Sequence, residues 1–154
     1  MVGPQRPSRR FRPATFAPPV AARLRAGLAL AHASEPFTPS DPRGAAGRVA
    51  RLAEALGLDV VTVRGGLDVG GAELDHVWVA VEGRVVDPTV VAGSSRFVAA
   101  LRAYVAGDLD ADDLDFLAHG HPIERRVLGA FPDTLGYVGA PVWSSRPPAL
   151  RVGG

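Results

Sequence analysis

The stretch from Leu74 to Thr89 constrains this chain most, because its pattern predicts a β-hairpin. Apolar residues alternate with others over six consecutive positions, which are His76, Val77, Trp78, Val79, Ala80 and Val81. A period of two is typical of a strand that is buried on one face. Glu82 and Gly83 then predict a tight turn, and Pro88 ends the returning strand because it has no amide hydrogen for the ladder.

The predicted hairpin brings an imidazole and a carboxylate to the same face. With a two-residue turn, His76 and Asp87 are diagonal neighbours, about 7–8 Å apart between backbones and within side-chain reach. Trp78 and Thr89 share this face and are the candidate cleft residues beside the pair. An imidazole that is oriented by a carboxylate provides two parts of a nucleophilic triad. The alternative interpretation is a surface histidine beside an aspartate at a strand end.

The order of residues in the hairpin resembles the transglutaminase-like superfamily. The string His-x-Trp-Val-x-Val, a glycine turn and then Val-Val-Asp-Pro-Thr is similar to the histidine and aspartate strands of that superfamily, above all in small bacterial members such as the peptidases of lasso-peptide maturation. The resemblance covers residues 40–90. It implies a papain-like α+β fold, in which N-terminal helices pack on a small antiparallel sheet and C-terminal helices follow. It also implies that His76 is a general base that Asp87 orients.

None of the 154 residues is a cysteine, whereas the nucleophile of the superfamily is normally a cysteine. The resemblance puts the position of that cysteine near Ser40, just before a predicted helix over residues 43–56 that Asp41 caps. Ser40 is therefore the candidate nucleophile, since a helix N-terminus stabilises developing negative charge. Serine also commonly caps helices, so a capping or loop role is the alternative.

The length of the chain predicts one domain, over residues 19–143. Its expected elements are helices over 19–33, 43–56 and 96–106, a short helix ending at His119, a strand over 58–64, a glycine-rich connection over 65–73 and an irregular segment over 131–143. Residues 144–154 predict a disordered tail. His119 and His121 form a pair that is too small for a metal site, which needs three or four ligands, and we expect no metal or other cofactor.

Residues 1–18 predict a flexible basic arm, because arginines alternate with prolines there. A nucleic-acid contact and an export signal are the alternatives. Prolines and arginines interrupt the apolar stretch that an export signal requires, and no segment has the roughly 18 apolar residues of a membrane span. We therefore expect a cytoplasmic protein without a membrane partner. The net charge of +1 provides no general attraction for nucleic acid.

Three hypotheses for the function follow. The preferred one is a pseudoenzyme, a non-catalytic transglutaminase-like domain that binds a peptide or partner protein in its cleft, because this explains the hairpin and the missing thiol together. The second is an active acyl-transfer or amide-hydrolysing enzyme, in which His76 and Asp87 activate Ser40. The third is a small nucleic-acid-associated domain that uses the N-terminal arginines, although basic and aromatic residues do not interleave on a strand.

Overall fold

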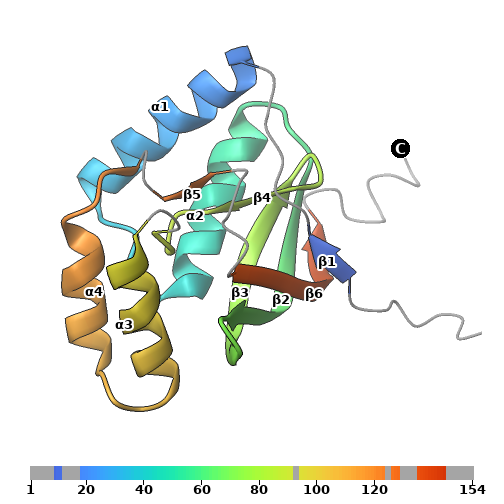
Figure 1. Ribbon diagram of the computed structural model, residues 1–154. Helices are drawn as coiled ribbons and strands as arrows, with labels where there is room; N and C mark the ends of the chain where they lie inside the picture. Colours follow the sequence, from blue (N-terminus) through green and yellow to red (C-terminus); the bar gives the residue numbers. More distant parts are fainter. Residues whose placement is uncertain (1–8, 12–17, 92–93, 124–125, 129–134, 145–154) are drawn as a thin grey trace, which may run out of the picture.

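The computed structural model describes residues 9–11, 18–91, 94–123, 126–128 and 135–144. The elements are, in chain order, β1 (Arg9–Phe11), α1 (Pro18–Ser34), α2 (Pro42–Ala55), β2 (Val60–Val69), β3 (Ala72–Val81), β4 (Arg84–Asp87), α3 (Ser95–Val105), α4 (Ala111–His119), β5 (Val127–Leu128) and β6 (Leu135–Ser144). The fold is mixed α+β, as the sequence predicts (Figure 1).

One antiparallel sheet forms the centre of the described structure. Its strands lie in the order β1-β6-β2-β3-β4-β5, and every neighbouring pair is antiparallel. The sequence predicted helices and an irregular segment after the hairpin, but the C-terminal part of the chain also supplies β5 and β6 (Figure 1). Because β6 inserts between β1 and β2, strands from both ends of the described chain meet in the sheet.

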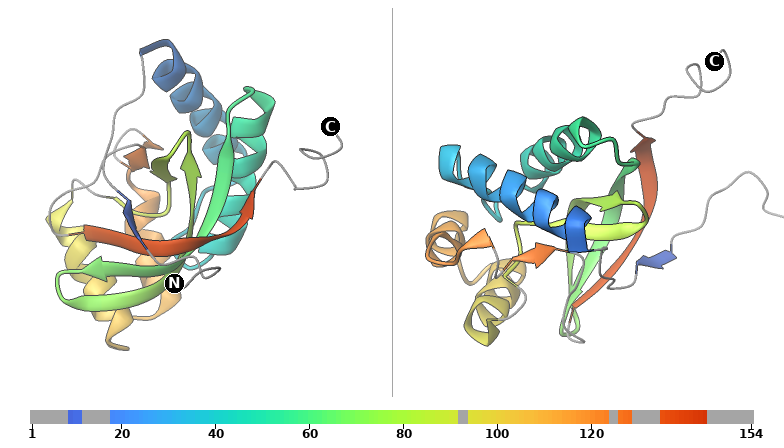
Figure 2. Two further views of the ribbon diagram at one scale, coloured as in Figure 1. Left: turned by 90° about the vertical axis from the view of Figure 1, so that its right-hand side faces the viewer. Right: turned by 90° about the horizontal axis from the view of Figure 1, so that it is seen from above.

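The sheet carries a hydrophobic core on each face, because successive side chains of a strand point to opposite sides. Val79 and Val81 of β3 belong to the core that includes buried side chains of α1 and α2. Trp78 and Ala80 belong to the core that includes buried side chains of α3 and α4. Figure 2 accordingly shows α1 and α2 on one side of β4 and β5, with α3 and α4 on the other side. The alternation that predicted the strand thus assigns each helix pair to a face.

Three helices begin at polar caps, and the first of these, Asp41, is the cap that the sequence predicted. The side chains of Asp41, Ser94 and Asp110 accept hydrogen bonds from backbone N–H groups in the first turns of α2, α3 and α4. Such caps satisfy amide groups that have no partner inside the helix. Gly57 follows α2 with φ of 78°, a conformation that glycine adopts without strain and that ends the helix.

The predicted glycine-rich connection over residues 65–73 is wrong at both ends, because β2 continues through Gly65 and Gly66 to Val69 and β3 begins at Ala72. A Cβ atom on Gly65 would lie 2.2 Å from the carbonyl oxygen of Val138 in β6. Glycine therefore allows β6 to approach β2 closely rather than ending the strand. The turn itself is at Gly70 and Gly71, which both have positive φ angles.

Two segments for which no strand was predicted each form a strand, and these two strands pair with each other. The expected irregular segment over residues 131–143 instead includes β6, which pairs with β2 along most of its length. Within the predicted arm over residues 1–18, Arg9–Phe11 forms β1 because β6 provides a partner strand. The remainder of the arm before residue 18 and the tail after residue 144 lie outside the described residues.

No helix in the described part of the chain is both long enough and apolar enough to cross a membrane.

Candidate functional site

The β3–β4 hairpin has the register that a two-residue turn predicts. Val81 pairs with Arg84, and Glu82 and Gly83 between them have φ angles of 53° and 80°. Positive φ angles at both central residues characterise a type of two-residue turn whose twist matches that of the flanking strands. The side chains of His76 and Asp87 consequently lie on one face of the sheet.

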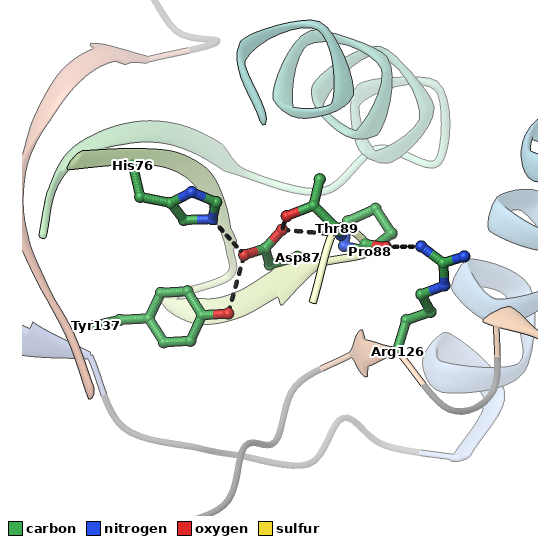
Figure 3. Close-up of polar contacts among 6 residues, drawn as sticks. All are labelled: His76, Asp87, Pro88, Thr89, Arg126 and Tyr137. Carbon is green, nitrogen blue, oxygen red and sulfur yellow. Dashed lines mark hydrogen bonds and ion pairs between the residues drawn. The ribbon is translucent and has the colours of Figure 1, made fainter. Parts of the chain in front are cut away.

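His76 and Asp87 form a buried pair. The Nε2 atom of His76 lies 2.8 Å from the Oδ2 atom of Asp87 (Figure 3). Each residue exposes 2% of its surface. The prediction that these two side chains reach one another is therefore confirmed, and the alternative of a surface histidine is wrong, because α3 and α4 cover this face of the sheet.

The carboxylate of Asp87 accepts hydrogen bonds on both oxygens. Tyr137 donates its hydroxyl to Oδ2 at 2.9 Å, and Thr89 donates its backbone N–H at 3.1 Å and its hydroxyl at 2.6 Å to Oδ1. Burial by itself would raise the pKa of Asp87, but the charge and hydrogen bond of His76 and the bonds from Thr89 outweigh it and lower the pKa below its ordinary value. Asp87 is thus held as a carboxylate.

Tyr137 is a member of the site that the sequence analysis missed. Burial raises its pKa well above the ordinary tyrosine value, and the charge of Asp87 raises it further. The phenol therefore keeps its proton and remains a donor to the carboxylate. Tyr137 lies on β6, in the segment predicted to be irregular, so only the pairing of β6 with β2 reveals that it faces the hairpin.

The hydrogen bond to Asp87 determines which nitrogen of His76 carries the lone pair. When the neutral imidazole donates from Nε2, its Nδ1 atom is the basic nitrogen. Nδ1 is buried and has no hydrogen-bond partner among the described residues. Trp78 stacks beside the ring, with centroids 6.0 Å apart and an interplanar angle of 23°. Asp87 therefore orients His76 as a general base would be oriented, but the surrounding side chains separate its basic Nδ1 atom from solvent.

Ser40, the candidate nucleophile, is bonded to another residue. Its backbone N–H donates to the Oδ1 atom of Asp115 at 2.9 Å, and its hydroxyl donates to the Oδ2 atom of the same carboxylate. No described hydrogen bond joins Ser40 to His76. The N-cap of α2 is Asp41, so Ser40 is a loop serine rather than the cap. Asp115, on α4, was not predicted as a partner.

A cavity of about 700 Å³ lies beside Ser40. Its walls come from the segment before α2, the first turns of α2 and one side of α4, and include Phe37, Arg48, Asp115 and Phe116. Phe116 is 78% exposed on this wall. Neither His76 nor the cleft candidates Trp78 and Thr89 line this cavity, and all three are buried beside the hairpin instead.

Arg126 is a second residue that the sequence did not indicate. It is 4% exposed, and its guanidinium donates to the carbonyls of Phe37 at 3.1 Å and Pro88 at 2.9 Å, as well as to two carbonyls at the end of α4 (Figure 3 shows the bond to Pro88). Burial lowers the pKa of Arg126 to about 10, although the charge of Asp87 opposes this. Arg126 therefore joins the cavity wall at Phe37 to the chain beside Asp87.

Within the described ranges, no group of three or more histidine, aspartate or glutamate side chains is arranged to hold a metal ion. No family model, curated protein or solved structure matches this chain.

Proposed function

We propose that this protein is a non-catalytic transglutaminase-like domain that binds a peptide segment in the cavity between α2 and α4. The observation that carries the proposal is the bonding of Ser40 to Asp115 on the cavity wall, while the His76–Asp87 pair is buried elsewhere. A nucleophile must lie within hydrogen-bond reach of its base. The absence of such a bond, together with the absence of cysteine, favours binding over covalent chemistry.

The cavity has the properties of a peptide site. Its volume of about 700 Å³ falls in the roughly 300–1,000 Å³ range of ligand sites. Phe116 offers an exposed aromatic surface on the cavity wall, and aromatic side chains are enriched in the interfaces of proteins. Asp112 and Arg51 also line the cavity and can orient the peptide through its charged or polar groups.

Selection from a random peptide library, followed by calorimetry on a selected peptide, tests this proposal. We expect Phe116→Ser to weaken binding at least about tenfold, because aromatic side chains dominate such interfaces. Leu30→Ser is the matched control, since Leu30 is 75% exposed and does not line the cavity. A library without binders, or equal binding by the two variants, contradicts the proposal.

Acyl transfer by Ser40 is the second candidate, and one observation favours it. His76 is oriented by Asp87 and has an Nδ1 atom without a partner among the described residues, which is the arrangement of a general base. For this function Ser40 would have to leave Asp115 and reach His76. A fluorophosphonate probe that labels the protein, but not its Ser40→Ala variant, would support the enzyme and argue against the pseudoenzyme.

The nucleic-acid hypothesis remains a prediction based on the arginines of residues 1–18. It requires binding that weakens steeply with salt and disappears when residues 1–18 are deleted. Binding that survives the deletion would contradict it.

A further inference from the structure

Phe37 forms a wall of the cavity and is enclosed by three basic side chains. It exposes 2% of its surface. The ring of His32, from the last turn of α1, stacks on it with centroids 5.9 Å apart and an interplanar angle of 10°. The guanidinium carbon of Arg48, from α2, lies 4.1 Å from the centroid of the Phe37 ring. With Arg126, these residues form what we call the Phe37 clamp.

The clamp also holds both backbone groups of Phe37. The N–H of Phe37 donates to the Nδ1 atom of His32 at 3.1 Å, and its carbonyl accepts from Arg126 at 3.1 Å. An imidazole nitrogen accepts a hydrogen bond only while it is unprotonated. The bond between Phe37 and His32 therefore exists only in the neutral form of His32.

Three basic side chains among the described residues disfavour the protonation of His32. Arg48 faces it from α2, His119 from α4 and Arg126 from the segment between α4 and β5. Burial is the largest effect, and the charges of these three residues add to it, so the pKa of His32 lies below the ordinary value. Arg48 is held in place because it also donates to the carbonyls of Ala31 and Glu35, each at 2.7 Å.

We propose that protonation of His32 releases Phe37 from the clamp and thereby reshapes the wall of the cavity. A proton on Nδ1 turns the acceptor into a donor that faces the N–H of Phe37, and it places a third cation beside Arg48 and Arg126. The clamp is intact above the ordinary histidine pKa of about 6.5 and is lost as the pH falls through the lower pKa of folded His32. This inference goes beyond peptide binding, since the release is a property of the free chain.

Nuclear magnetic resonance on the full chain tests the release. Between about pH 7.5 and pH 4.5, we expect the protection factor of the Phe37 amide to fall at least about tenfold, with the same midpoint as the titration of the His32 ring. The amide of Val79, in the buried β3–β4 ladder, should keep its protection. Loss of protection at both amides would mean general unfolding and would overturn the proposal. A protection factor of the Phe37 amide that does not change with pH would overturn it as well.

Two variants separate the role of His32 from other titrations. His32→Asn keeps an acceptor near the position of Nδ1 but does not titrate, so the Phe37 amide should stay protected at low pH. His121→Asn is the control and should release Phe37 as the natural chain does. A release that persists in His32→Asn would contradict the proposal. Because no peptide is present, failure of the proposed function cannot produce any of these results.

Discussion

The hydroxyl of Tyr137 donates to the carboxylate of Asp87 across 50 residues of sequence, at 2.9 Å. The oxygen that accepts this bond also bonds to His76, so strand β6 helps to hold the orientation of the pair on the β3–β4 hairpin. Burial and the neighbouring negative charge keep Tyr137 protonated. The phenol is thus a donor at physiological pH, and the contribution of its hydrogen bond can be measured.

Tyr137→Phe removes one donor from a buried carboxylate and keeps the ring that packs on Trp78. We expect the free energy of unfolding to fall by about 1–3 kcal/mol, as is typical when a buried charged acceptor loses a partner. Urea denaturation at neutral pH measures the change. Tyr104→Phe, on the partly buried surface of α3, is the matched control, and an equal change in the two variants would contradict this role of Tyr137.

Asp87→Asn should remove a pH dependence from the stability. Because the pKa of Asp87 is lower in the folded chain, its ionisation stabilises the fold above the unfolded pKa of about 3.9, and this contribution is lost as the pH falls through the folded pKa. The natural chain should therefore exceed the variant in stability most at neutral pH, and the difference should shrink below about pH 4. Urea denaturation at several pH values measures it. A difference independent of pH would contradict the lowered pKa.

Arg126→Met leaves several carbonyl groups without their donor in a buried position. We expect a loss of about 3 kcal/mol or more in the free energy of unfolding. Arg126→Lys should recover only part of it, because one ammonium cannot reproduce the planar fork of the guanidinium. Arg25→Met, at an exposed position of α1, controls for the loss of an arginine. Thermal or urea unfolding measures the change. If Arg126→Met and Arg25→Met lose the same free energy of unfolding, the hydrogen bonds of Arg126 do not stabilise the connection between Phe37 and the chain beside Asp87.

Ser40→Cys tests whether His76 of the hairpin can activate a nucleophile at position 40. The carboxylate of Asp115 beside this position should raise the pKa of the new thiol and slow its alkylation. We therefore expect slow labelling that is the same with His76 or with His76→Asn, and faster labelling after Asp115→Ala. Mass spectrometry of iodoacetamide-treated protein measures the rates. Labelling that requires His76 would instead favour the enzyme hypothesis.

The local interactions of this protein can be predicted from its sequence. The alternation around Trp78 and the short turn at Gly83 specify the hairpin and its register, because strand period and turn length leave few alternatives. The caps at Asp41, Ser94 and Asp110 act within three residues of themselves. For the same reason, the approach of His76 to Asp87 could be predicted before the fold was known.

The interactions between distant parts of the chain depend on how its elements pack. Ser40 meets Asp115 across 75 residues, and Arg126 meets the carbonyl of Phe37 across 89 residues. Strand β6 likewise exists because β2 and β1 provide its hydrogen-bond partners. No local periodicity encodes such pairs, since their geometry depends on how all the elements pack. The hairpin therefore marks a histidine–aspartate pair, while the packing decides that the candidate serine bonds to Asp115, beside a cavity that the pair does not line.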